Sequence, residues 1–230
     1  MSKRKACLVI NPRGGANVAK MTDILAVLAA GEYQTRVVLK EYGGHTLELS
    51  QQAAEEKCDM IVAYGGDGTL NQVVNGVLNA ASKSVVGVLP GGTANLWASE
   101  IGVPTDNAAR AALALLNSQA RRVDVGCVSV QDLLVPTEDV QAQDKPTAQE
   151  KKTTSRKRKN QVRQATRRHF LLMAGLGLDA AVIQGVSKPL KYKIKQLAVG
   201  LSAARELPAY QPFPMEVRTG GGDLLWRGEA

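Results

Sequence analysis

Residues 59–80 read DMIVAYGGDGTLNQVVNGVLNA, and this stretch decides the fold. The apolar run Asp59–Tyr64 predicts a short buried strand, which ends at the turn Gly65-Gly66-Asp67-Gly68. A helix is predicted next, at Leu70–Ala80, because its apolar residues recur at helical spacing on one face. A buried strand, a glycine-rich turn and an amphipathic helix together are the repeating unit of α/β proteins.

The same unit occurs earlier and later in the chain. Ala6–Ile10 predicts a strand that ends at Asn11-Pro12-Arg13-Gly14-Gly15, and Val85–Leu89 predicts one that ends at Pro90-Gly91-Gly92. The other elements expected before residue 131 are strands at Tyr33–Leu39 and Arg122–Val130 and helices at Val18–Ala30, Thr46–Lys57, Ala94–Ile101 and Asp106–Leu116. This alternation predicts a mostly parallel sheet with helices on its faces. The three glycine-rich turns would then lie at the carboxyl ends of strands, where such folds bind ligands.

The pattern changes after residue 130. Asp132–Arg168 lacks periodicity, and nine Lys and Arg residues without an acidic one lie between Lys151 and Arg168, so a disordered insertion is expected. The elements expected afterwards are a strand at His169–Ala174, helices at Ala180–Val186 and Leu190–Arg205, and a hairpin of Pro214–Thr219 with Leu224–Gly228. We therefore predict an α/β domain at 1–130, a basic insertion at 131–168 and the start of a β-rich domain at 169–230. Because the hairpin stops at the chain end, a C-terminal truncation is expected.

Composition limits the class of protein. The chain has 44% hydrophobic residues and a formal charge of +8, much of it in the basic insertion. Cys7, Cys58 and Cys127 are far apart and lack metal-ligand spacing, which favours reduced thiols inside a cell. No apolar run reaches the roughly 18–20 residues of a membrane-spanning helix. A cytoplasmic protein, peripheral to the inner face of the membrane at most, is the expectation.

The turn Gly65-Gly66-Asp67-Gly68-Thr69 has two interpretations from its residues alone. Glycines let the backbone approach a phosphate, and the helix that follows presents free N–H groups to it. Asp67 would then hold Mg²⁺, orient a hydroxyl or fix the loop. Alternatively the turn is only a turn, with Thr69 as the helix N-cap and Gln72 completing a capping box. Both interpretations stay open at this point.

Three motifs together resemble the catalytic domain of the diacylglycerol kinase family, which includes bacterial lipid kinases and sphingosine kinases. They are Asn11-Pro12 with Gly15, Gly65-Gly66-Asp67-Gly68-Thr69-Leu70-Asn71, and Gly92-Thr93-Ala94-Asn95. Asp124-Val125-Gly126 is similar to the family's strand that leads to a second domain, and Gly175–Ala180 is similar to that domain's opening. The resemblance implies an NAD kinase/diacylglycerol kinase-like fold and transfer of the γ-phosphoryl group of ATP, with Mg²⁺, to a lipid hydroxyl. Diacylglycerol and sphingoid bases are the acceptors considered.

The resemblance also implies site residues. Those implied to bind nucleotide are Asn11, Gly15, Lys40, Gly65, Gly66, Asp67, Gly68, Thr69, Leu70, Asn71, Gly92 and Thr93. Asp67, acting through Mg²⁺ or water, and Asp179, orienting the lipid hydroxyl, are the catalytic candidates, and a helix N-cap is the alternative for Asp179. Gln72 and Leu96 depart from the family's usual Glu and Asp. The family's general-base Glu lies beyond residue 230, so we expect nucleotide binding with poor lipid phosphorylation.

Rival functions use some of the same residues. NAD kinases share the Gly-Gly-Asp-Gly-Thr loop, but the Asn11-Pro12 start and the Gly92–Asn95 loop favour lipid kinases. Gly175–Ala180 also fits a dinucleotide fingerprint, yet the acidic residue expected after a second strand is missing.

A further alternative is that the chain is a catalytically inactive fragment that binds nucleotide or associates with a membrane. The basic segment 151–168 would contact an anionic membrane or serve as a solvated linker. It lacks interleaved aromatic residues, so no nucleic acid is expected; a homodimer is compatible with the sequence.

Overall fold

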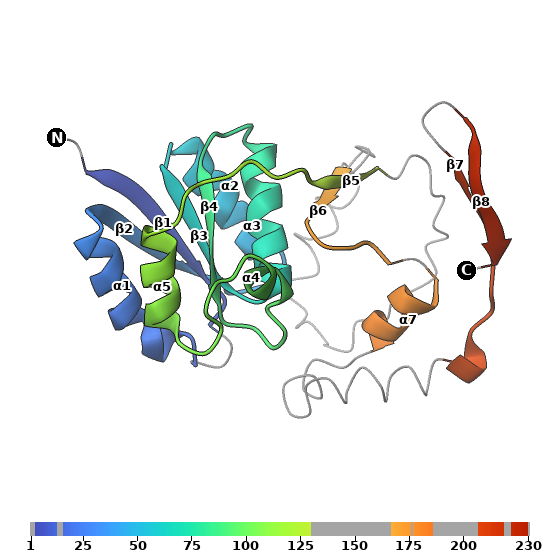
Figure 1. Ribbon diagram of the computed structural model, residues 1–230, viewed down its shortest axis with the longest axis horizontal. Coiled ribbons are helices and arrows are strands. Elements are labelled where there is room, and N and C mark those ends of the chain that lie inside the picture. The colour runs from blue at the N-terminus through green and yellow to red at the C-terminus, as the bar shows by residue number, and fades with distance from the viewer. Residues whose placement is uncertain are drawn as a thin grey trace, which may run out of the picture. The chain divides into compact units, whose positions relative to one another are not determined.

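The computed structural model describes residues 3–12, 16–129, 167–175, 177–185, 207–218 and 222–229. The first four strands form a wholly parallel sheet in the order β2-β1-β3-β4 (Figure 1). The strands are β1 (Arg4–Ile10), β2 (Tyr33–Leu39), β3 (Met60–Gly65) and β4 (Val85–Pro90). The register aligns their ends, since Ile10 lies opposite both Leu39 and Tyr64, and Gly65 lies opposite Pro90. The predicted α/β class is confirmed.

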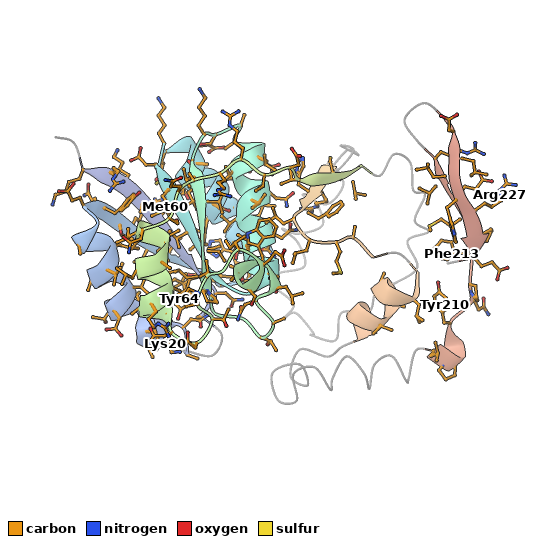
Figure 2. All side chains as sticks on the ribbon, in the orientation of Figure 1. Lys20, Met60, Tyr64, Tyr210, Phe213 and Arg227 are labelled. Atoms are coloured by element: carbon orange, nitrogen blue, oxygen red, sulfur yellow. The ribbon has the colours of Figure 1, made fainter. Side chains whose placement is uncertain are left out.

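Helices cover both faces of this sheet, which explains why its central strands are apolar without alternation. Every residue of β3 is buried, as expected for a parallel strand with helices on both sides. The 3₁₀ turn Val18–Lys20 leads into α1 (Met21–Ala30), which packs with α5 (Ala108–Leu116) on one face (Figure 1). The core under these two helices is made mostly of small and branched side chains: Ala6, Leu8, Ile10, Ile24, Leu28, Met60, Val62, Tyr64, Leu89, Ala108, Ala111 and Ala112. Met60 and Tyr64 mark the two ends of β3 in Figure 2.

The opposite face is covered by α2 (His45–Glu55) and α3 (Asp67–Asn79), which approach each other closely. Gly76 makes this approach possible, because a Cβ atom there would lie 2.7 Å from the Leu47 carbonyl oxygen. Ser50 is fully buried at the same contact, and its hydroxyl donates to the Thr46 carbonyl oxygen at 2.6 Å. A backbone-to-backbone contact of this kind fixes the position of α3, and with it the position of the glycine-rich turn that precedes the helix.

The helix after that turn begins earlier than the sequence predicted. Helix α3 starts at Asp67 instead of Leu70, and Gly66 is its N-cap in an extended conformation, with φ −93° and ψ −175°. Thr69 therefore lies inside the first turn of α3, and the alternative of Thr69 as N-cap with Gln72 in a capping box is wrong. The physical reason is that the close contact of α3 with α2 at Gly76 outweighs the weak helix preference of Gly68 and Thr69. Gly66 supplies no side-chain cap.

The remaining predicted elements are present with small shifts where the structure describes them. Helix α4 (Leu96–Glu100) starts two residues later than expected. Strand β5 (Gly126–Ser129) is shorter than the predicted Arg122–Val130 and pairs antiparallel with β6 (Arg167–Phe170). Strand β6 thus begins inside the predicted insertion and ends four residues before the predicted strand His169–Ala174 does. Helix α7 occupies Leu178–Gly185, and a 3₁₀ turn occupies Leu207–Ala209. The predicted helix Leu190–Arg205 and the predicted insertion up to residue 166 lie outside the described residues.

The predicted hairpin near the end of the chain is confirmed. Strands β7 (Pro214–Arg218) and β8 (Leu224–Glu229) pair antiparallel, with Val217 opposite Trp226. On the other face Glu216 forms ion pairs with Arg218, at 2.7 Å, and with Arg227. The pairing thus places Val217 and Trp226 on one face and Glu216 and Arg227 on the other, as strand periodicity requires.

The chain divides into two compact units, one of Met1–Ala120 with Leu172–Ala230 and one of Arg121–Leu171. The predicted boundaries 1–130, 131–168 and 169–230 stay predictions. Among the described residues, no helix combines the length and the apolar character needed to span a membrane.

The three cysteines are free thiols. Cys7 and Cys58 are buried, and Cys127 is exposed. Burial raises the pKa of the Cys7 thiol to about 11.

Candidate functional site

Three glycine-rich loops lie at the carboxyl edge of the parallel sheet, as the alternation of elements predicted. The first loop follows β1 and is described at Asn11, Pro12, Ala16 and Asn17; the second is Gly65–Thr69; the third is Gly91–Asn95. The aligned strand register brings them together, because the Asn11 backbone amide donates to the Tyr64 carbonyl oxygen at 3.0 Å. Lys40 reaches the same edge at the end of β2, where its amide donates to the Ile10 carbonyl oxygen at 2.9 Å.

The second and third loops contact each other through their backbones. The Gly91 amide donates to the Gly65 carbonyl oxygen at 2.8 Å. Gly92 faces Gly66 so closely that a Cβ atom on Gly92 would overlap the Gly66 Cα atom and lie 2.9 Å from its nitrogen. No residue with a side chain fits at position 92 without separating the loops. These glycines are therefore required by the contact between the loops, independently of any ligand.

Asp67 joins the same two loops through its side chain. One carboxylate oxygen, Oδ1, accepts the backbone N–H of Trp97 at 3.0 Å. Trp97 is the second residue of α4, where a backbone N–H lacks a partner within the helix. The turn into α4 is closed by Asn95, which has a φ of 52° and whose Oδ1 accepts the Gly92 amide at 2.8 Å. Of the three roles considered for Asp67, fixing the loop is the one that these contacts support.

Asn17 joins the first loop to the third, and sequence reasoning missed it. The residue is 5% exposed, and its side-chain Nδ2 donates to the carbonyl oxygens of Asn11, at 2.7 Å, and Gly91, at 3.3 Å. A Cβ atom on Gly91 would lie 2.6 Å from that nitrogen, so glycine at 91 makes room for the amide. The partner Gly91 is 74 residues away in the chain, and no local pattern marks such a contact.

Replacing Asn17 by alanine is expected to lower the free energy of unfolding by about 1–3 kcal/mol, because two part-buried carbonyl oxygens lose their donor. Urea unfolding followed by circular dichroism measures this change. Asn79→Ala, at the exposed end of α3, is the matched control and should change stability by less than about 0.5 kcal/mol. Equal effects of the two substitutions would show that the amide does not hold the loops.

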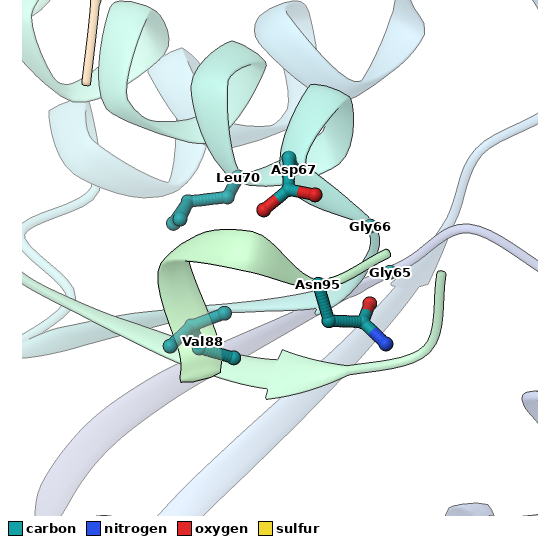
Figure 3. A pocket seen from close by; sticks show the side chains of 7 residues that line it. Gly65, Gly66, Asp67, Leu70, Val88 and Asn95 are labelled. Atoms are coloured by element: carbon teal, nitrogen blue, oxygen red, sulfur yellow. The ribbon is translucent and has the colours of Figure 1, made fainter. Parts of the chain in front are cut away.

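A shallow hollow lies between the second loop and α4 (Figure 3). Its lining consists of Gly65, Gly66, Asp67, Leu70, Val88, Asn95 and Ala98. The hollow encloses no space for even a water molecule, so it cannot enclose a nucleotide. Asp67 and Asn95 place polar groups at its rim.

Most of the implied nucleotide-binding residues in the described part of the chain gather at this edge. Asn11 and Thr69 contact each other, since the Asn11 side-chain nitrogen Nδ2 lies 3.4 Å from Thr69 Oγ1. Gly68 is exposed, with open space where a side chain would be. Leu70, Gly92 and Thr93 lie in or beside the loops. Asn71 Oδ1 is a buried oxygen that finds no hydrogen-bond partner among the described residues, and the same holds for Oε1 of the adjacent Gln72.

Two implied residues are not placed at this edge by the structure. Gly15 lies outside the described residues. Asp179 is the second residue of α7, which follows Gly177 at a φ of 72°, so the alternative of Asp179 as helix N-cap is wrong. Its role toward a lipid hydroxyl stays a prediction. Within the described ranges, no group of three His, Cys, Asp or Glu residues could hold a metal ion.

Two tyrosines near the edge have perturbed hydroxyl groups. Burial raises the pKa of Tyr64, the residue before Gly65. A hydrogen bond to Glu48 raises the pKa of Tyr42, in the loop after β2. Both phenols stay neutral well above physiological pH, so neither supplies a base for proton abstraction at pH 7.

Comparison with known families identifies the unit that carries the loops. Residues 5–128, more than half of the chain, match the diacylglycerol kinase catalytic domain. The chain belongs to this family. The matched range runs from β1 through β5 and so contains all three glycine-rich loops and every contact between them described above.

Individual members of the diacylglycerol kinase family agree with this assignment. A diacylglycerol kinase of Bacillus subtilis is 27% identical over 228 residues, which are 98% of this chain and 62% of that protein. One from Staphylococcus aureus strain JH9 is 33% identical over 126 residues, 54% of this chain and 40% of its own length. The chain therefore spans less than two thirds of these relatives.

Solved structures show the same fold. A crystal structure of a putative diacylglycerol kinase from Bacillus anthracis superimposes with a TM-score of 0.67 at 24% identity, over 100% of this chain and 63% of the other. A second structure from that organism, described as a diacylglycerol kinase, gives a TM-score of 0.65 at 22% identity, with the same coverage. At these identities the likeness establishes the architecture and leaves the chemistry to be argued from the site.

Proposed function

We propose that the chain is the nucleotide-binding part of an ATP-dependent lipid kinase, which transfers the γ-phosphoryl group of Mg·ATP to a lipid hydroxyl. The observation that carries the proposal is the contact between three glycine-rich loops at one sheet edge, in a chain whose residues 5–128 match the diacylglycerol kinase catalytic domain. Diacylglycerol is the acceptor in the names of its relatives, and a sphingoid base or similar lipid is the alternative.

The geometry of the second loop suits a phosphate. Helix α3 has 13 residues, and its first turn begins at Asp67 directly after Gly66, so its free N–H groups face the carboxyl edge of the sheet. A Cβ atom at Gly68 would meet nothing within 4 Å, which leaves the backbone open to a ligand. Catalysis of phosphoryl transfer rests mostly on positioning and on stabilising charge, and linked loops supply the positioning.

The described residues supply too few ligands to bind Mg²⁺ by themselves, but they are compatible with Mg²⁺ that is already bound to the phosphates of a nucleotide. Mg²⁺ bound to nucleotides takes one or two carboxylates from the protein and completes its shell with phosphates and waters. Asp67 is the carboxylate on the second loop, and the buried oxygens Asn71 Oδ1 and Gln72 Oε1, unpaired within the described part of the chain, lie one turn along α3. Asp67 would hold the ion through the oxygen that does not accept the Trp97 amide. The ion would neutralise charge on the phosphates.

Two parts of the chain are proposed to contact the lipid substrate and the membrane. Asp179, at the start of α7, is proposed to orient the lipid hydroxyl. A cytoplasmic protein that meets its substrate at the inner membrane surface is proposed, with the basic segment 151–168 in contact with anionic lipid. Deleting that segment should then lower binding to anionic vesicles and leave ATP affinity unchanged.

Thermal unfolding in the presence of ligands tests the nucleotide proposal. Mg·ATP at about 100 times its dissociation constant should raise the free energy of unfolding by about 2.7 kcal/mol, whereas NAD at the same concentration should not. Quenching of Trp97, which is next to the third loop, reports binding on the same sample. A folded chain that does not respond to Mg·ATP would contradict the proposal, and stabilisation by NAD alone would favour an NAD kinase.

Transfer is tested separately from binding. The chain is incubated with Mg·ATP and mixed micelles that contain either diacylglycerol or sphingosine, and labelled lipid phosphate is measured. Formation of phosphatidic acid or sphingosine phosphate identifies the acceptor class. ATP binding without any labelled lipid would limit the proposed function of these 230 residues to nucleotide binding.

A further inference from the structure

A fourth loop reaches the carboxyl edge of the sheet, and its role is not assigned by the glycine-rich motifs. It comprises residues 40–44, which connect β2 to α2. Its first residue is tied to the strand that precedes the first loop, because the Lys40 amide donates to the Ile10 carbonyl oxygen at 2.9 Å. The fourth loop therefore belongs to the same edge as the phosphate-binding loops proposed above.

Two aromatic rings stack on each other here, one from the fourth loop and one from the first residue of α2. The rings of Tyr42 and His45 are 4.3 Å apart between centroids, with 5° between their planes. Tyr42 is 49% exposed, so about half of its surface is accessible to a ligand. A stacked pair can receive a third planar group on its open face, as bases do on aromatic side chains.

Hydrogen bonds hold the pair in place without a ligand. The Tyr42 hydroxyl donates to Glu48 Oε2 at 2.5 Å, and His45 Nδ1 accepts the Glu41 amide at 3.2 Å. Gly44 makes the turn between the rings with a φ of 90°, a conformation that favours glycine. At Gly43 and Gly44 a Cβ atom would meet nothing within 4 Å, so the surroundings of the stack are open. Two hydrogen bonds and the turn at Gly44 thus fix the aromatic pair before a ligand binds. An exposed pair held in this way is suited to binding a planar group.

The spacing of the strands fits one extended ligand. Strands β2, β1 and β3 are consecutive in the sheet, and neighbouring strands are about 4.8 Å apart, so the end of β2 lies roughly 10 Å from the second loop. In a nucleoside triphosphate a ribose and two phosphates separate the base from the terminal phosphate, which gives a comparable reach.

We propose that the Tyr42–His45 stack is the platform for the purine base of the nucleotide whose phosphates the glycine-rich loops hold. The proposal rests on the proposed nucleotide-binding function and adds the subsite that distinguishes a nucleotide from free polyphosphate. The open face of Tyr42 receives the base, and His45 supports the opposite face of the ring. Lys40 lies in sequence between the stack and β2.

The test compares two ligands that differ only in carrying a nucleoside. Affinities of Mg·ATP and of magnesium triphosphate are measured by calorimetry for the wild type, Tyr42→Ala and Tyr42→Phe. Tyr42→Ala should weaken ATP binding about tenfold, the loss of one base–aromatic stack, and leave triphosphate binding unchanged. Tyr42→Phe keeps the ring and should bind ATP within about twofold of the wild type.

Tyr33→Ala is the matched control. Tyr33 starts β2 at the opposite edge of the sheet, where the Arg4 guanidinium lies over its ring at 4.3 Å. Melting temperatures of all variants are recorded, and Tyr42→Ala should melt close to the wild type because the side chain is half exposed. Two results would contradict the platform while leaving the proposed nucleotide-binding function intact. One is an unchanged ATP affinity in Tyr42→Ala, and the other is an equal loss of affinity for ATP and triphosphate. A wild type that binds neither ligand would overturn the proposed function together with the platform.

Discussion

Replacing Gly92 by alanine is expected to abolish the stabilisation by Mg·ATP and to lower the free energy of unfolding by about 1–3 kcal/mol. The added methyl group would overlap backbone atoms of Gly66, which cannot rotate away as a side-chain tip can. The second and third loops must therefore separate, and their hydrogen bond between the Gly91 amide and the Gly65 carbonyl oxygen is strained or lost. Thermal shift with and without Mg·ATP measures both effects.

Gly68→Ala is the matched control for stability within the same site. A Cβ atom at Gly68 meets nothing within 4 Å, and the residue lies in the first turn of α3. Alanine there should leave the melting temperature equal to or above that of the wild type, since alanine favours helix over glycine by up to about 1 kcal/mol. If Gly92→Ala were as stable as Gly68→Ala, the close contact between the loops would not exist in solution.

Asp67→Ala and Asp67→Asn are expected to differ sharply, because the contact seen at Asp67 needs an acceptor more than a charge. Asparagine keeps an oxygen that can accept the Trp97 amide, which lies 3.0 Å from Asp67 Oδ1, whereas alanine removes it. A hydrogen bond to a charged group contributes about 1.5–3 kcal/mol, so Asp67→Ala should weaken Mg·ATP binding by about tenfold or more. Asp67→Asn keeps a neutral hydrogen bond of about 1 kcal/mol to the Trp97 amide and loses only the charge toward Mg²⁺, so its affinity for Mg·ATP should lie between those of Asp67→Ala and the wild type.

Trp97 fluorescence and calorimetry on the two variants separate the roles of Asp67. An altered emission of Trp97 is expected in Asp67→Ala and not in Asp67→Asn. If the two variants lost ATP binding equally while Trp97 emission stayed as in the wild type, the negative charge would be what matters. Asp67 would then act chiefly on Mg²⁺ and not as the connection between the loops.

The sequence was sufficient for the elements of the sheet and for the edge that carries the site. A run such as Asp59–Tyr64 is too short for a typical helix and is followed by a glycine-rich turn, which together indicate a buried strand and mark its carboxyl end. The start of one helix was not predicted correctly, because Asp67-Gly68-Thr69 is a turn by composition and is helical in the structure. Local propensity failed there because Gly76 docks α3 onto α2, and tertiary packing outweighs the weak preference of Gly68 and Thr69.

Contacts between the loops could not be predicted from local pattern. Asn17 binds Gly91 across 74 residues, and Asp67 binds Trp97 across 30. Each depends on the order of strands in the sheet, which a single sequence does not specify. Tyr42 was passed over for a related reason, since only the stacked geometry with His45 distinguishes it from an ordinary exposed tyrosine.

The links among the three glycine-rich loops have a consequence for the speed of ligand capture. Asn17, Asp67 and the Gly66–Gly92 contact connect the loops before any ligand arrives, so little ordering entropy is lost when a ligand binds. Association should then be one step, with an observed rate that rises linearly with nucleotide concentration and does not saturate at a slow rearrangement. The same rigidity implies that differences in affinity among nucleotides arise in their dissociation rates.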